Sequence, residues 1–231
     1  MLHLDHLILT QDGFRLQANW SIAQGTKLAL LGGSGEGKST LLMGLAGFLP
    51  LTSGRILWQG RDLGPLPPAE RPMAILFQDQ NLFPHLTIAQ NLGLALAPNL
   101  RLGRDQTARI DAVLDRLGLT GLGNRRPADL SGGQQGRAAL GRVLLQDRPV
   151  LLLDEPFAAL GPALKTDLLT LVRDLATEAG TLVLLVTHDP ADAKRFAGRT
   201  VLVADGLAHP PVETAALFAD PPQALRDYLG G

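Results

Sequence analysis

One glycine-rich segment constrains the fold of this chain more than any other feature. Residues 32–39 read GGSGEGKS, which fits the pattern G-x-x-x-x-G-K-[ST], and they follow the apolar run KLALL at residues 27–31. A helical pattern begins at Lys38. A buried strand, a glycine-rich turn and a helix in this order form a cradle in which successive backbone N–H groups point at phosphate oxygens. The segment therefore predicts a phosphate-binding loop.

The residues of this loop have distinct expected roles. Lys38 supplies positive charge to the β- and γ-phosphates of a nucleoside triphosphate, and the Ser39 hydroxyl is suited to bind Mg²⁺. The helix N-terminus adds partial positive charge. The alternative is a glycine-rich turn that binds no ligand. The expected strand before the segment and the expected helix after it favour the phosphate loop. The predicted phosphate contacts are Gly32, Gly33, Ser34, Gly35, Glu36, Gly37, Lys38, Ser39 and Thr40.

An acidic pair follows a second apolar run, VLLLD at residues 150–154. Open α/β sheets bind ligands at the carboxyl ends of their strands, where Asp154 is expected to hold Mg²⁺ directly or through water. Glu155 is placed to polarise the attacking water as a general base. An Asp-Glu pair after a strand is by itself often only a helix cap. Together with the glycine-rich loop, the pair predicts binding and hydrolysis of a nucleoside triphosphate.

The remaining apolar runs predict a doubly wound α/β core. Residues 73–77, 181–186 and 200–203 are almost fully apolar, as strands buried on both faces of a parallel sheet are. Leu2–Leu9 and Phe14–Trp20 flank a Gln-Asp-Gly turn and predict an antiparallel pair. The tail after His209 predicts one or two short helices. Helical patterns lie between the strands, at residues 38–47, 105–118, 132–146, 162–179 and 190–196.

The connection between residues 77 and 150 is too long for a simple crossover. It holds roughly 70 residues with helical periodicity, whereas a crossover needs about 10–12. We therefore predict an inserted helical subdomain at residues 85–148. Residues 1–84 then form the first part of the core, and residues 149–231 form its second part with a short tail.

Composition excludes several classes of function. The chain has no cysteine, which excludes disulfides, thiolate metal sites and a cysteine nucleophile. Its net charge of −1 provides no general attraction for nucleic acid, so we expect no nucleic-acid partner. No apolar run approaches the ~18 residues of a membrane span, and we expect no secretory signal at the N-terminus.

A second glycine signature, LSGGQ at residues 130–134, opens the helical pattern after Ser131. Ser131 is a good N-cap, so the simplest interpretation is a capped helix. Two glycines after a cap cost about 1 kcal/mol each relative to Ala, which is understandable if the N–H groups approach an anion. Because the chain already has a phosphate loop, we predict that Ser131, Gly133 and Gln134 face the nucleotide of a second copy in a head-to-tail homodimer.

The order of these motifs resembles the ABC-type ATPase family, since LSGGQ stands after the glycine-rich loop and before LLLDEP. The resemblance covers essentially the whole chain. It implies a P-loop NTPase fold with a RecA-like parallel core, an N-terminal antiparallel β subdomain and an inserted helical subdomain. It also implies that Gln78 senses Mg²⁺ and water and that His188 contacts the γ-phosphate. A histidine that merely precedes a helix capped by Asp189 is the alternative for His188.

Three departures from the family pattern affect what the resemblance implies. Residues 158–161 read AALG where the family has SALD, so Gly161 lacks a carboxylate that reaches toward the partner's phosphate loop. Residues 135–137 read QGR instead of RQR. The aromatic residue that stacks on adenine is not evident: Gln11 stands near its expected position, and Phe14 is either a substitute or a packing residue.

The resemblance also narrows the type of ABC ATPase. Lys38 and Ser131 lie only about 90 positions apart, which excludes relatives with long coiled-coil insertions. The chain resembles stand-alone importer subunits that engage separate transmembrane permease subunits at the cytoplasmic face of the inner membrane, supplied by a periplasmic substrate-binding protein. Leu82, Phe83 and Leu86 resemble the groove for a permease coupling helix, or they pack internally.

The segment at residues 76–96, with Ala46-Gly47-Phe48 and Arg71-Pro72, most resembles the thiamine-importer ATPases. This implies an ATP-binding and hydrolysing subunit that imports thiamine or its phosphates. Importers of another small solute or of a metal ion are one alternative. A nucleotide-gated subunit with weak catalysis, caused by Gly161, is another.

Overall fold

The computed structural model describes all residues except Gln80, Ala159 and Gly231. The chain forms two compact units. Unit 1 comprises residues 1–73, 149–155 and 169–231, and unit 2 comprises residues 74–148 and 156–168. The boundaries of the helical subdomain at 85 and 148 stay a prediction.

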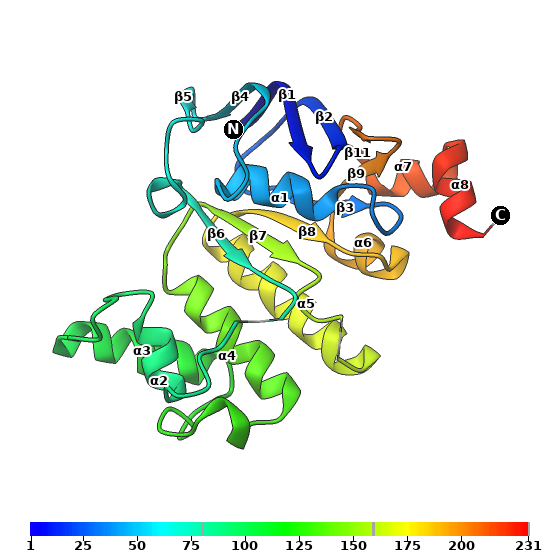
Figure 1. Cartoon of the computed structure of the whole chain (residues 1–231). Helices are drawn as coiled ribbons and strands as arrows, with labels where there is room; N and C mark the ends of the chain where they lie inside the picture. The colour runs from blue at the N-terminus through cyan, green and yellow to red at the C-terminus, as the bar shows by residue number, and fades with distance from the viewer. Residues whose placement is uncertain (80, 159, 231) are drawn as a thin grey trace. The chain divides into compact units, whose positions relative to one another are not determined.

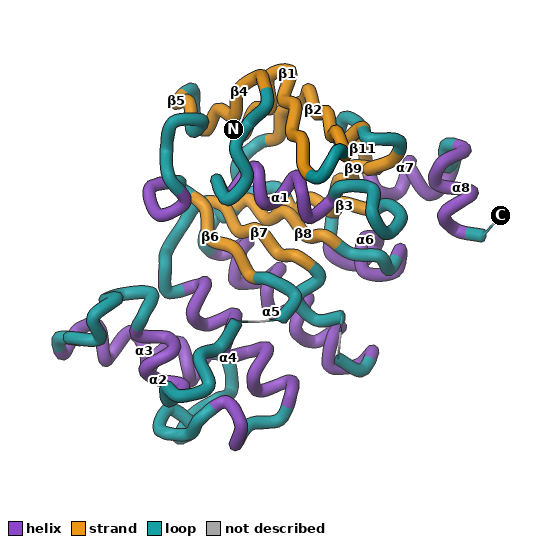
Figure 2. The backbone as a smooth tube through the Cα atoms, viewed as in Figure 1, coloured by secondary structure: helices purple, strands orange, loops and turns teal. Residues whose placement is uncertain are grey.

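Unit 1 contains a mixed sheet in the order β5-β4-β1-β2-β10-β9-β3-β8-β7, with β11 beside β9 (Figures 1 and 2). β1, β2, β4 and β5 pair antiparallel, whereas β9, β3, β8 and β7 run parallel. These strands are β1 (Leu2–Gln11), β2 (Phe14–Ile22), β3 (Lys27–Leu31), β4 (Ser53–Trp58), β5 (Arg61–Asp62), β7 (Val150–Asp154), β8 (Leu182–Val186), β9 (Arg199–Ala204), β10 (Leu207–Ala208) and β11 (Val212–Glu213).

The parallel strands are apolar because both of their faces are buried. Every residue of β8 is buried, as are the first four of β7 and the last four of β3. Leu30 of β3 and Asp154 of β7 both pair with Val186, so the carboxyl ends of the three strands lie at one edge of the sheet. The predicted parallel core is confirmed.

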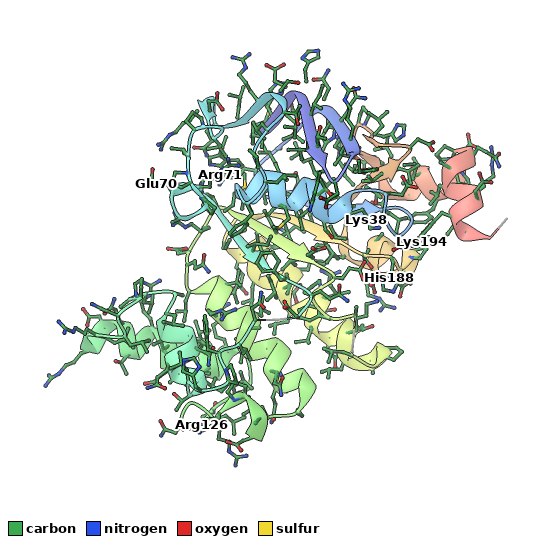
Figure 3. The ribbon with its side chains drawn as sticks, in the orientation of Figure 1. Lys38, Glu70, Arg71, Arg126, His188 and Lys194 are labelled. Atoms are coloured by element: carbon green, nitrogen blue, oxygen red, sulfur yellow. The ribbon has the colours of Figure 1, made fainter. Side chains whose placement is uncertain are left out.

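Helix α1 (Lys38–Ala46) contacts both β1 and β7 (Figure 1). Its C-terminal end is held by Arg71, which is only 3% exposed. The Arg71 guanidinium donates from Nη1 to the carbonyl oxygens of Gly44 at 2.8 Å and Leu45 at 2.7 Å. The Gly44 carbonyl oxygen also accepts from the backbone N–H of Gly47 at 3.2 Å. A cation at this end adds a donor to the last carbonyls of the helix and complements the helix dipole. Arg71, labelled in Figure 3, therefore anchors the helix that begins at the phosphate loop.

Residues 53–62 form strands that the sequence interpretation did not include. β4 pairs antiparallel with β1, with Ile56 opposite Leu4. Only Ile56 and Trp58 of β4 are buried, so the segment has a weak apolar pattern of its own. Its extended form is fixed by pairing with β1, which is a tertiary effect.

The helices of unit 2 are α2 (Ile88–Gly93), α3 (Arg104–Arg116) and α4 (Gly132–Leu144), with contacts among all three. β6 (Met73–Leu76) leads into them, and α5 (Pro162–Glu178) has residues in both units. The helices predicted at 105–118 and 132–146 are confirmed. α2 was not predicted, although Thr87 and Gln90 form a capping box whose sequence pattern is recognisable.

The C-terminal part of unit 1 contains α6 (Pro190–Phe196), α7 (Thr214–Ala219) and α8 (Gln223–Leu229). The short helices predicted for the tail are confirmed. Leu217 of α7 and Leu225 of α8 form a buried cluster with Leu31 and Leu202. α8 is thereby packed on the strand that ends at the phosphate loop. In the described part of the chain, no helix combines the length and apolarity needed to span a membrane.

Candidate functional site

The predicted phosphate loop connects β3 to α1, as the sequence pattern requires. Gly37, at the N-cap of α1, has φ 93°, a left-handed conformation that favours glycine. A Cβ at Gly32 would lie 2.1 Å from the carbonyl oxygen of Val203. Lys38 is 6% exposed, and its Nζ donates to the carbonyl oxygens of Gly32 at 2.8 Å and Gly33 at 2.6 Å. The ammonium is thus held against the loop in which it is predicted to bind phosphate.

The Lys38 ammonium is partly removed from solvent. Burial lowers the pKa of the Lys38 ammonium, while the carboxylates of Glu155, Asp154 and Glu36 act in the opposite direction. The main effect is loss of solvation. A partly desolvated ammonium on a phosphate loop is suited to charge-assisted hydrogen bonds with phosphate oxygens.

Asp154 and Ser39 lie together at the carboxyl end of β7. The Ser39 hydroxyl donates to Oδ1 of Asp154 at 3.0 Å. Burial raises the pKa of the Asp154 carboxyl, and Glu155 raises it further, whereas the Ser39 hydrogen bond and Lys38 lower it. A hydroxyl and a partly buried carboxylate form an oxygen-donor set of the kind that Mg²⁺ prefers.

Glu155 and His188 meet at the same edge. Nδ1 of His188 lies 2.8 Å from Oε2 of Glu155, with side chains 58% and 21% exposed respectively. Glu155 has φ 44°, an uncommon conformation for a residue with a side chain. Its backbone N–H donates to the carbonyl oxygen of Val186 at 3.2 Å, which holds it beside the end of β8. Such outliers concentrate at functional sites.

The segment after His188 has the predicted capping geometry. Asp189 is the N-cap of α6, and its Oδ1 accepts from the backbone N–H of Ala191 at 2.9 Å, with Pro190 in the first turn. The helix cap accounts for the presence of Asp189 and Pro190 at these positions. It does not account for the contact between His188 and Glu155. Lys38 at the start of α1 and His188 before α6 are both labelled in Figure 3.

The sequence of residues 16–158 matches the family model described as "ABC transporter". The chain belongs to the ABC transporter family. It is 64% identical over 230 residues to the thiamine import ATP-binding protein ThiQ of Cereibacter sphaeroides, with 100% of each chain covered.

Two solved structures support the same assignment. The dimeric, post-hydrolysis ATP-binding cassette MJ0796 bound to ADP and Pi is 29% identical, with a TM-score of 0.80, covering 93% of this chain and 99% of that one. CbiO1 from Clostridium perfringens, part of the ABC transporter complex cbiONQ, is 30% identical, with a TM-score of 0.84, covering 95% and 90%. The predicted P-loop fold of the ABC-ATPase type is confirmed, and the chain is an ABC-type ATPase.

The ABC signature residues begin α4 in unit 2. Ser131 is its N-cap: Oγ accepts from the backbone N–H of Gln134 at 3.4 Å, and Oε1 of Gln134 accepts from the Ser131 N–H at 2.9 Å. This confirms the predicted cap. A Cβ at Gly133 would lie 2.2 Å from Cδ2 of Leu164, so close packing also requires this glycine. Contact of Ser131, Gly133 and Gln134 with a nucleotide stays a prediction.

Other predicted site residues also stay predictions in their roles. Gln78 is exposed in the turn after β6 in unit 2. Gln80, in the same segment, and Ala159, in the predicted D-loop, lie outside the described residues. Gly161 is exposed immediately before α5.

The candidates for adenine contact lie near the phosphate loop. A Cβ at Gly37 would lie 2.6 Å from Cε1 of Phe14, so this half-buried ring packs against the loop. Oε1 of Gln11 lies 3.5 Å from the hydroxyl of Thr40. Packing therefore accounts for the position of Phe14, and stacking of its ring on adenine stays a prediction.

One further contact at this edge has no signal in the sequence. The Tyr228 hydroxyl in α8 donates to the carbonyl oxygen of His188. The two residues are 40 positions apart, and the sequence around Tyr228 carries no motif that would indicate the contact.

Proposed function

We propose that this chain binds and hydrolyses ATP as the energising subunit of a bacterial ABC importer for thiamine or its phosphates. The main support is that three features lie together at one edge of the sheet. They are Lys38 on the phosphate loop, the Ser39–Asp154 pair and the Glu155–His188 pair. Identity of 64% to a thiamine import ATP-binding protein supports the substrate.

The geometry supports a separate role for each of these residues during hydrolysis. The backbone N–H groups of residues 32–37 and the ammonium of Lys38 bind the phosphates. The Glu155 carboxylate accepts a proton from water as the water oxygen bonds to the γ-phosphorus, and the bond to the β–γ bridging oxygen breaks, leaving ADP and phosphate. His188, hydrogen bonded to Glu155, orients the carboxylate and contacts the γ-phosphate.

Mg²⁺ fits the oxygen donors at this edge. The Ser39 hydroxyl would ligate the ion, and Asp154 would hold it directly or through water. Gln78 is proposed to sense the ion and water. When bound, the ion neutralises charge on the β- and γ-phosphates.

A second copy of the chain completes the proposed site. Ser131, Gly133 and Gln134 begin a helix whose N–H groups suit an anion, and we assign them to the nucleotide held by the partner copy. The dimeric ATP-binding cassette with 29% identity supports a homodimer.

Unit 2 contains a surface suited to transmembrane permease subunits. A pocket of about 300 Å³ is lined in part by Phe77, Phe83 and Arg142, and Phe83 is 44% exposed. Leu82 and Leu86 are half-buried nearby in sequence. We assign docking of a permease helix to this surface. The chain then works at the cytoplasmic face of the inner membrane, and a periplasmic binding protein supplies the substrate.

Gly161 favours a second candidate, a nucleotide-gated subunit with weak catalysis. A Cβ at Gly161 meets nothing within 4 Å, so an aspartate fits there. We expect Gly161→Asp to change steady-state phosphate release by less than about three-fold, because the proton acceptor and the phosphate loop are intact.

Gly161→Asn is the matched control, because Asn caps a helix about as well as Asp but carries no charge. An increase of more than about ten-fold with Asp and not with Asn would favour the weakly catalytic subunit.

A further inference from the structure

The segment around His188 is anchored at two sides. Thr187 Oγ1 donates to Oδ2 of Asp192 at 2.8 Å in the buried interior, and the Asp189 N–H donates to Thr187 Oγ1 at 3.0 Å. Both bonds hold neighbours of His188. The His188 backbone itself accepts a hydrogen bond from the Tyr228 hydroxyl, which comes from α8.

Tyr228 in turn packs against a buried apolar cluster of unit 1. Leu225, one turn earlier in α8, is fully buried in the cluster that includes Leu31, the residue immediately before the phosphate loop. Ala224 and Tyr228 pack against that cluster. Figure 1 shows α8 beyond α7 at the C-terminal end of the chain. The helix therefore connects the base of the phosphate loop to the backbone of His188.

A pocket of about 270 Å³ lies between these elements within unit 1. It is lined on one side by Gly32, Gly33 and Glu36 of the phosphate loop and on the other by Asp227 and Tyr228 of α8. Tyr228 thus stands close to both parts of the proposed site.

The Tyr228 hydroxyl is a donor at neutral pH, because a tyrosine is protonated there even without any shift of its pKa. Burial raises the pKa of the Tyr228 hydroxyl, and the carboxylates of Glu155 and Asp189 raise it further. Because a raised pKa favours the protonated phenol, the O–H remains available to the His188 carbonyl.

We propose that Tyr228 is a positioning residue: its hydrogen bond to the His188 carbonyl fixes the imidazole beside Glu155. The proposal rests on the function proposed above, because it assigns His188 to ATP hydrolysis. Nδ1 of His188 lies 2.8 Å from Oε2 of Glu155, and the imidazole is 58% exposed. A side chain with so little packing takes its orientation from the position of its backbone and from this one hydrogen bond.

Tyr228→Phe tests the proposal, because it removes the hydroxyl and keeps the ring in its packing. We expect kcat for ATP hydrolysis to fall about five-fold, with KM for ATP within about two-fold of wild type, since loss of one hydrogen bond affects orientation and not the phosphate loop. Leu229→Ala, a change at an exposed position of the same helix, is the matched control and is expected to preserve kcat.

A second readout does not depend on hydrolysis. The chain has five histidines, and the imidazole Cε1–H signal of His188 is identified in NMR spectra by its loss in His188→Gln. We expect this signal to shift or broaden in Tyr228→Phe and to remain in place in Leu229→Ala.

The ATPase and NMR measurements distinguish a failure of the proposed function from a failure of the positioning role of Tyr228. If the wild-type protein hydrolyses no ATP, the proposed function fails, and the NMR comparison still decides whether Tyr228 holds His188. An unchanged His188 signal in Tyr228→Phe overturns the positioning role. A change in KM by the same factor as the change in kcat also overturns it.

Discussion

Replacement of Glu155 by Gln is expected to lower steady-state ATP hydrolysis by about 10²–10⁴-fold, the usual contribution of a general base. The amide keeps the size of the side chain and can still hydrogen bond to His188, which lies 2.8 Å from the carboxylate. The amide cannot accept the proton of the attacking water. ATP affinity is expected to stay within a few-fold of wild type, because the phosphate loop is intact. Phosphate release by the purified protein with Mg²⁺ and ATP measures the effect.

The same variant is expected to accumulate the ATP-bound dimer, since hydrolysis is the step that reopens it. Light scattering after addition of ATP then gives a doubled mass for Glu155→Gln. Glu70→Gln, at an exposed carboxylate on the same unit, is the matched control and is expected to keep wild-type turnover. Turnover by Glu155→Gln within ten-fold of wild type would refute the assignment of the base.

Lys38→Ala is expected to weaken ATP binding about 10- to 100-fold, the loss that follows removal of charge-assisted hydrogen bonds to phosphate. The fold is expected to tolerate the change. Burial lowers the pKa of Lys38, so keeping its charge at neutral pH costs folding free energy, and the alanine removes that cost. Equilibrium titration with a fluorescent ATP analogue measures affinity, and thermal unfolding without nucleotide measures stability.

Lys27→Ala is the matched control for this prediction. Lys27 also donates to a glycine carbonyl, that of Gly25 at 2.9 Å, but it lies at the other end of β3 from the phosphate loop. Its replacement is expected to leave ATP affinity unchanged. Equal losses of affinity in Lys27→Ala and Lys38→Ala would indicate a general effect on β3 rather than a lost phosphate contact.

The sequence predicts much of unit 1 because its strands and loop carry strong local signals. The runs at 27–31 and 150–154 are apolar throughout because both faces of β3 and β7 are buried, and GGSGEGKS has few alternatives to a phosphate loop. The caps at Ser131 and Asp189 follow from local chemistry and are confirmed.

Features fixed by tertiary contacts were not predictable in the same way. β4 takes its extended form from pairing with β1, and Arg71 acts through carbonyls of Gly44 and Leu45 that lie about 26 positions away. The Tyr228 contact joins α8 to His188 across the fold. In each case the local sequence lacks the information, because the partner is supplied by distant parts of the chain.

The central claim is that ATP hydrolysis by this chain energises thiamine import. The most direct test isolates the chain with the membrane subunits that co-purify with it, reconstitutes the complex in vesicles with its binding protein, and measures ATPase rate with and without thiamine. We expect thiamine to stimulate the rate in the wild-type complex and not in the Glu155→Gln complex. An ATPase rate that responds to a different solute and not to thiamine would contradict the claim.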